Sequence, residues 1–103
     1  MSLEDLLREE VQKLVDIAIE NIPWDMTKFS TQKSQSTLQY KDISDFVYGF
    51  EYGSIVSDSI SYYQNKVVGG LVTKEKLEQA ITIINSIISD RVPEIRQAIS
   101  RIV

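Results

Sequence analysis

Apolar side chains recur with helical spacing over most of the chain. Between positions 3 and 22 they return every three or four residues, which is typical of an amphipathic helix. Ser2 and Asp5 are expected to cap its start. Pro23 is expected to end it, because proline cannot donate the backbone hydrogen bond that a helix interior requires. The stripe expected to be buried consists of Leu3, Leu6, Leu7, Val11, Leu14, Val15, Ile17, Ala18 and Ile22.

The longest predicted helix covers residues 42–67, with Asp42 as its N-cap and Gly69 and Gly70 after its end. Small residues stand at every fourth position of it. A glycine inside a helix costs about 1 kcal/mol relative to alanine, so we expect the small residues to let another backbone approach closely. The face expected to pack comprises Phe46, Gly49, Phe50, Gly53, Val56, Ser57, Ile60, Ser61 and Val67.

The remainder of the chain predicts two further helices. Thr73 is a good N-cap for a helix over 74–91, and Pro93 is expected to break the chain and to start a short helix over 94–103. The apolar face of the longer one consists of Leu77, Ala80, Ile81, Ile83, Ile84, Ile87 and Ile88. That of the shorter one consists of Ile95, Ala98, Ile99, Ile102 and Val103.

The segment 23–41 is rich in serine, threonine and glutamine and is predicted to be irregular. A helical turn near residues 25–29 is expected to pack Trp24, Met26 and Phe29 on the core, and residues 30–37 are expected to be mobile. Three lysines stand among its aromatic residues, at Lys28, Lys33 and Lys41. Weak nucleic-acid binding through 26–41 is therefore one hypothesis, although a solvated linker explains the same pattern more simply.

These elements predict an all-α protein with one domain over residues 1–103. Three long helices and a short C-terminal one favour a small antiparallel helical bundle, four-helix and up-and-down-like. No stretch of 18 apolar residues is present, nor is there a basic start followed by an apolar run. We therefore expect no membrane span and a cytoplasmic location.

Composition narrows the chemistry. The chain has no cysteine and no histidine, which removes thiolate nucleophiles and the commonest general base and metal ligand. A net charge of −4 disfavours general attraction to nucleic acid. The motifs of nucleotide-binding loops, zinc proteases and serine hydrolases do not occur. We expect no enzymatic activity, no cofactor and no metal.

The candidate function is therefore protein–protein interaction through the longest helix. Its small-residue stripe (Gly49, Gly53, Ser57 and Ser61) is expected to receive a second copy of the chain, giving a homodimer, or another helical protein. The opposite face, with Tyr48, Tyr52, Glu51 and Asp58, is the second candidate surface.

An alternative is a helical carboxylate site for a divalent metal or a phosphorylated ligand, with hydrolysis as an extension. It would use Glu51 and Asp58, which lie seven residues apart on one helix, with Glu10 or Glu20 from the first helix. Glu10 projects into an apolar arc. It is expected either to pair with a cation or to reach solvent at the helix edge or a subunit interface.

Overall fold

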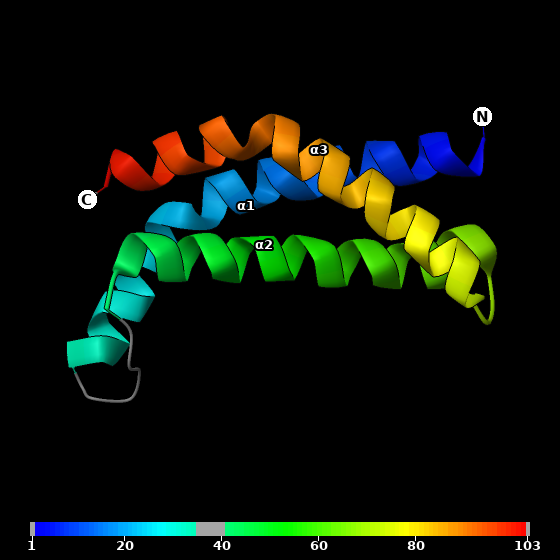
Figure 1. Cartoon of the computed structure of the whole chain (residues 1–103). Helices are drawn as coiled ribbons and strands as arrows, with labels where there is room; N and C mark the ends of the chain where they lie inside the picture. The colour runs from blue at the N-terminus through cyan, green and yellow to red at the C-terminus, as the bar shows by residue number, and fades with distance from the viewer. Residues whose placement is uncertain (1, 35–40, 103) are drawn as a thin grey trace.

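The computed structural model describes residues 2–34 and 41–102, and it is made of helices. Helix α1 spans Leu3–Ser34, α2 spans Ile43–Tyr62 and continues directly into a π-helix, η1, over Tyr63–Val68, and α3 spans Lys74–Ser100. The three long helices pack on one another as an up-down-up bundle, in which α2 runs against the direction of its two neighbours (Figure 1). The all-α bundle is confirmed.

Helix α1 does not end at Pro23, as predicted, but continues for eleven more residues. Its later part, coloured cyan, bends away from the line of the blue part (Figure 1). Pro23 is exposed, so the position that lacks a backbone N–H faces away from the core. Buried residues after the bend hold the extension in place. Phe29 packs edge-on against Phe46 and Phe50 of α2, with ring centroids 5.0 and 4.8 Å apart.

The prediction for residues 23–41 is therefore wrong as far as Ser34, which is helical. Met26 and Phe29 are buried, as expected, but Trp24 is 77% exposed. Of the segment 30–37, which was expected to be mobile, residues 30–34 belong to α1. Residues 35–37 lie outside the described residues.

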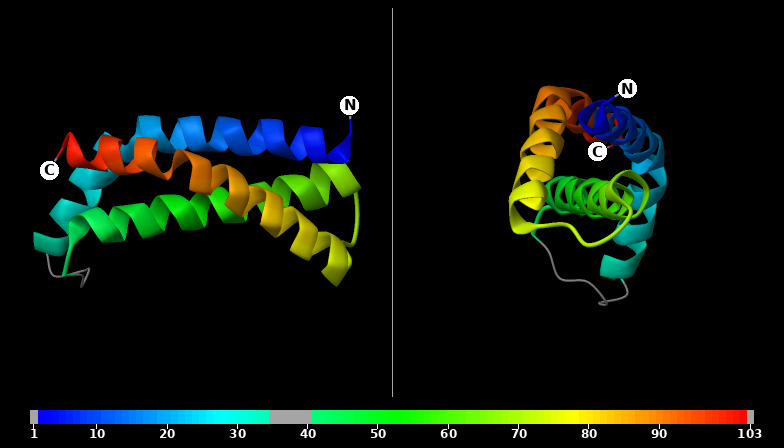
Figure 2. Two further views of the ribbon diagram at one scale, coloured as in Figure 1. Left: turned by 45° about the horizontal axis from the view of Figure 1, so that its top comes forward. Right: turned by 90° about the vertical axis from the view of Figure 1, so that its right-hand side faces the viewer.

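A separate C-terminal helix is also wrong, because residues 94–100 continue α3 through Pro93. In the part of the chain that the structure describes there is thus no fourth helix. The yellow half of α3 crosses α2, and its orange half runs beside α1 (Figure 2). Arg96 in the later half also reaches α2, where it pairs with Asp45 at 2.9 Å. Ile95 and Ile99, beyond the proline, are buried with the rest of the core.

The N-caps predicted at Asp42 and Thr73 and the glycine predicted after the longest helix, Gly69, are confirmed. The backbone N–H of Ser44 donates to Asp42 Oδ1 at 2.8 Å, and that of Lys76 donates to Thr73 Oγ1 at 3.2 Å. Gly69 has a φ of 73°, the left-handed conformation that glycine adopts without strain. Each of these signals is local, involving residues within a few positions of the helix end.

The core follows a regular pattern on each helix. On α1 the buried positions advance by 4, 4 and 3 residues, from Leu7 to Phe29, which keeps them on one face of a helix with 3.6 residues per turn. On α2 and η1 they advance by four, and this row consists of Val47, Glu51, Ile55, Ser59 and Tyr63. The small-residue stripe (Gly49, Gly53, Ser57 and Ser61) is shifted by two positions from this buried row. Two positions correspond to a rotation of 200° about the helix axis, so the stripe lies on the opposite, exposed face. The predicted packing face is therefore wrong for the small-residue stripe, although its members Phe46, Val56, Ile60 and Val67 are partly buried against the core.

Among the described residues, no helix combines the length and the sustained hydrophobicity that a bilayer-spanning segment requires.

Candidate functional site

A pocket of about 270 Å³ opens between α1 and α2. Its floor is buried and includes Ala18, Glu51 and Ile55, whereas Ile17 and Phe50 stand exposed at its rim. The other lining residues are Leu14, Asn21, Asp25, Ser54 and Asp58. The pocket thus combines apolar walls with three acidic side chains.

Glu51 is the unusual member of this pocket, because it occupies a core position. It is only 3% exposed, and its Oε1 has no hydrogen-bond partner among the described residues. Burial, followed by hydrogen bonding to Asp25 and the negative charge of Asp25, raises the pKa of Glu51 to about 8. At neutral pH this side chain is therefore mainly the uncharged acid, which can both donate and accept a hydrogen bond.

Asp25 reaches the pocket only because α1 continues through Pro23. It stands four residues after Asn21, so both side chains lie on one face of the helix. Sequence reasoning placed Asp25 in an irregular segment and missed it. The signal that could have found it is the apolar spacing of Ile22, Met26 and Phe29, which maintains the helical period past the proline.

The small-residue stripe forms a second, shallower depression on the outer face of α2. A groove of about 390 Å³ is lined by Gly49, Phe50, Gly53, Ser54, Ser57 and Asp58. A Cβ added at Gly49 or Gly53 would meet no atom of the described chain within 4 Å, apart from the adjacent residues and the surrounding backbone of α2. The close approach expected of these glycines is therefore not made within the bundle, and Ser61, farther along the stripe, is exposed as well.

The structure separates the tyrosines from the acidic residues with which the sequence grouped them. Tyr52 OH donates to Asn85 Oδ1 of α3 at 2.6 Å, and the guanidinium of Arg96 lies over the Tyr48 ring at 4.0 Å. The two tyrosines therefore join α2 to α3, whereas Glu51 and Asp58 do line one pocket, on the side of α1.

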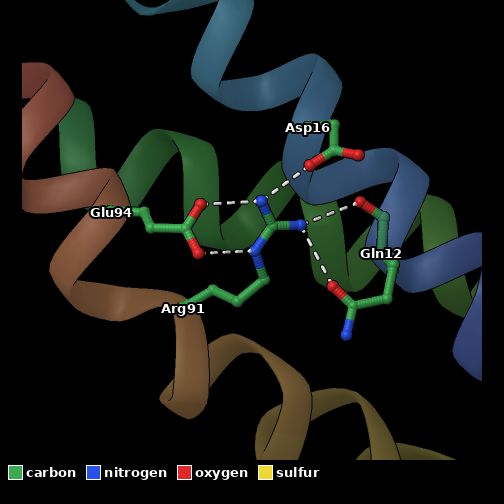
Figure 3. Close-up of polar contacts among 4 residues, drawn as sticks. All are labelled: Gln12, Asp16, Arg91 and Glu94. Carbon is green, nitrogen blue, oxygen red and sulfur yellow. Dashed lines mark hydrogen bonds and ion pairs between the residues drawn. The ribbon is translucent and has the colours of Figure 1, made fainter.

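A polar cluster around Arg91 joins α3 to α1 (Figure 3). Its Nη1 donates to the backbone oxygen and to Oε1 of Gln12, and its Nη2 pairs with Asp16 at 2.6 Å. Glu94, one turn later on α3, receives bonds from Nε and Nη2 at 3.2 and 2.8 Å. Each of the three guanidinium nitrogens of Arg91 thus contacts a protein oxygen of Gln12, Asp16 or Glu94. We therefore assign this cluster to the packing of α1 on α3.

The remaining candidates are dispersed. Glu10 is half-buried and Glu20 is exposed, and neither lines the pocket. The described residues contain no group of three acidic side chains close enough to hold a metal ion. Lys28 lies over the Phe29 ring at 5.2 Å, and Lys41 is exposed. The side chain of Lys33 lies outside the described residues.

The chain matches no protein-family model, no curated protein and no solved structure.

Proposed function

We propose that the chain is a non-catalytic interaction module that pairs with a second copy of itself through the outer face of α2. The observation that carries this proposal is the open groove along Gly49, Gly53 and Ser57. Glycine in a helix lowers stability, and in the described structure neither glycine gains a packing contact in return. A helix from another molecule would supply that contact, since small residues let two helix backbones approach closely.

An exposed aromatic side chain beside the groove supports the same surface. Phe50 lines the groove and is 39% exposed. Ile17, which is 50% exposed, lines the adjoining pocket, where Phe50 also lies. Large exposed apolar groups near a groove are typical of interaction sites.

A second copy is the occupant that best fits the groove. Within it the small residues carry no charge, and Asp58 is the acidic member of its lining. Two copies of α2 that cross near Gly53 would place the same residues on both sides of a two-fold axis, which is the usual arrangement of homodimers. Such a crossing keeps the aspartates, which lie toward one end of the groove, away from the two-fold axis.

The experiment is the molar mass in solution, measured by light scattering over a concentration series. The wild-type chain should reach the mass of a dimer, and Gly53→Leu should remain a monomer with unchanged helix content, because the position is exposed and a Cβ there meets no atom of the described chain beyond the neighbouring turns of α2. Ser86→Leu, at an exposed position of α3, is the matched control and should still dimerise. A wild-type chain that stays monomeric at every concentration, or a Gly53→Leu variant that dimerises equally well, would refute the proposal.

The carboxylate-site alternative is weaker on this geometry. Glu51 and Asp58 share a pocket, but Asp25 replaces the expected Glu10 or Glu20 as the contribution of α1. Among the described residues, no basic side chain lines the pocket to receive a phosphate. Nucleic-acid binding through the lysines remains a hypothesis without an added observation in its favour.

A further inference from the structure

The pocket between α1 and α2 has the features of a second binding site, on the side of α2 that faces α1. Its floor holds Glu51 Oε1, a polar atom that is buried and lacks a hydrogen-bond partner in the described structure. A buried acceptor without a partner costs about 1–3 kcal/mol. A ligand that donates a hydrogen bond to this oxygen would recover that cost.

The charge of the lining selects the kind of ligand. The acidic side chains come from both helices, Asp25 from α1 and Glu51 and Asp58 from α2. The described lining includes neither lysine nor arginine, and α3 contributes no residue to it. A cation is therefore favoured over an anion on electrostatic grounds.

The apolar part of the lining favours an organic cation over a metal ion. Half of the lining residues are apolar, namely Leu14, Ile17, Ala18, Phe50 and Ile55. Among the described residues, no three acidic side chains lie close enough together to coordinate one metal ion. The volume of about 270 Å³ is slightly below the usual range of roughly 300–1,000 Å³ for ligand pockets, so the ligand should be small.

We propose that this pocket binds a small primary alkylammonium ion, with its charged group at Glu51 and its alkyl chain against the apolar wall. A primary ammonium has three N–H donors, enough for Glu51 Oε1 and for Asp25, which is close to Glu51, while the charge of Asp58 acts from a greater distance. The exposed ring of Phe50 at the rim offers a further contact of the cation–π type.

Binding is coupled to the loss of a proton. In the free protein at pH 7 Glu51 is mainly protonated, because its pKa is raised to about 8. An ammonium ion stabilises the carboxylate form, so the acid proton passes to the buffer while the amine stays protonated and no covalent bond changes. About one proton should be released per bound amine at pH 7. Since about half of Glu51 is ionised at pH 8 and about one hundredth at pH 6, affinity should be about fiftyfold weaker at pH 6.

The test is calorimetric titration of the full chain with n-butylammonium chloride, in buffers of different ionisation enthalpy, from pH 6 to pH 8. Glu51→Gln should weaken binding by more than about tenfold and abolish the proton release. Asp58→Asn, at the exposed rim, should also weaken it without affecting the fold. Glu20→Gln, which removes an exposed acid of α1 outside the pocket, should bind as the wild type does.

Two further titrations identify the chemistry. n-Butanol has the same chain without the charge and should bind much more weakly. Nα-acetyl-lysine N-methylamide carries the same ammonium group as a protein side chain would. Binding of this compound without binding of butylammonium would overturn the proposal and assign the pocket to a lysine of a partner protein. Equal binding by Glu51→Gln, equal binding of butanol, or no binding of millimolar butylammonium at pH 8 would overturn it as well. Because Gly53 does not line the pocket, the same titrations on the Gly53→Leu variant separate amine binding from dimerisation.

Discussion

The buried acid at position 51 makes the stability of the fold depend on pH in a predictable direction. We consider the substitution Glu51→Gln, which replaces the hydroxyl of the protonated acid by an amide NH2. The new side chain has nearly the same shape, retains a donor toward Asp25 and cannot ionise. It therefore represents the uncharged form of Glu51 at every pH.

The sign and size follow from the pKa in the two states. In the unfolded chain Glu51 ionises around its ordinary pKa of 4.5, whereas in the fold its pKa is about 8. The stabilisation that the bound proton contributes is fully present below pH 4.5, falls between pH 4.5 and 8, and is absent above pH 8. At about 1.4 kcal/mol per pKa unit, the whole difference is about 5 kcal/mol, of which about 3 kcal/mol is lost by pH 7.

The assay is urea denaturation of both proteins at a series of pH values from 4 to 9, read by circular dichroism. The variant and the wild type should be about equally stable near pH 4, and the variant should gain about 3 kcal/mol over the wild type by pH 7. Glu20→Gln controls for the removal of one acidic residue from the surface. If the difference between Glu51→Gln and the wild type is the same at pH 4 and pH 8, the raised pKa of Glu51 is refuted.

Three further substitutions test other contacts by the same denaturation assay. Ser59→Ala removes a buried hydroxyl that has no hydrogen-bond partner among the described residues, and should stabilise the fold by about 1 kcal/mol, unlike Ser86→Ala at an exposed site. Arg91→Lys retains the charge but loses the planar fork that reaches the backbone of Gln12, and should cost about 1–2 kcal/mol; an unchanged midpoint would contradict the packing role of this cluster. Gly53→Ala should stabilise the monomer by about 1 kcal/mol, since nothing in the described bundle obstructs the new methyl group. A loss of stability in the monomer would show that the outer face of α2 is packed.

Sequence reasoning was reliable where the determinants are local. The caps at Asp42 and Thr73 and the left-handed Gly69 depend on residues a few positions apart, so the sequence alone indicates them. It was wrong at both prolines for a common reason. The cost of a missing hydrogen bond is a local quantity, but burial of Phe29 and Ile95 beyond the prolines is gained from other helices.

The burial of α2 could not have been read from its composition. Two rows of residues recur every fourth position, and they differ by only two positions in register. The outer row is adjacent to Phe46 and Phe50 and contains two glycines, which suggested a packed face, whereas the inner row includes Glu51 and Ser59. Only the contacts with α1 and α3 decide between them. The candidate site was affected in the same way, because Glu51 was expected on the face opposite the packed one, and Asp25 was expected in a separate helical turn and not on a continuation of the first helix.

The pocket and the groove lie on either side of one wall. Phe50, Ser54 and Asp58 line both of them, one helical turn apart along α2, between the row of Glu51 and the row of Gly53. If both proposals hold, an amine in the pocket and a second chain in the groove would touch the same three side chains. Any shift in their positions that favours one ligand must then change the affinity for the other. By thermodynamic linkage, if a bound amine changes the dimerisation constant by some factor, dimerisation changes the affinity for the amine by the same factor. Light scattering with and without butylammonium therefore tests whether amine binding and dimerisation are coupled.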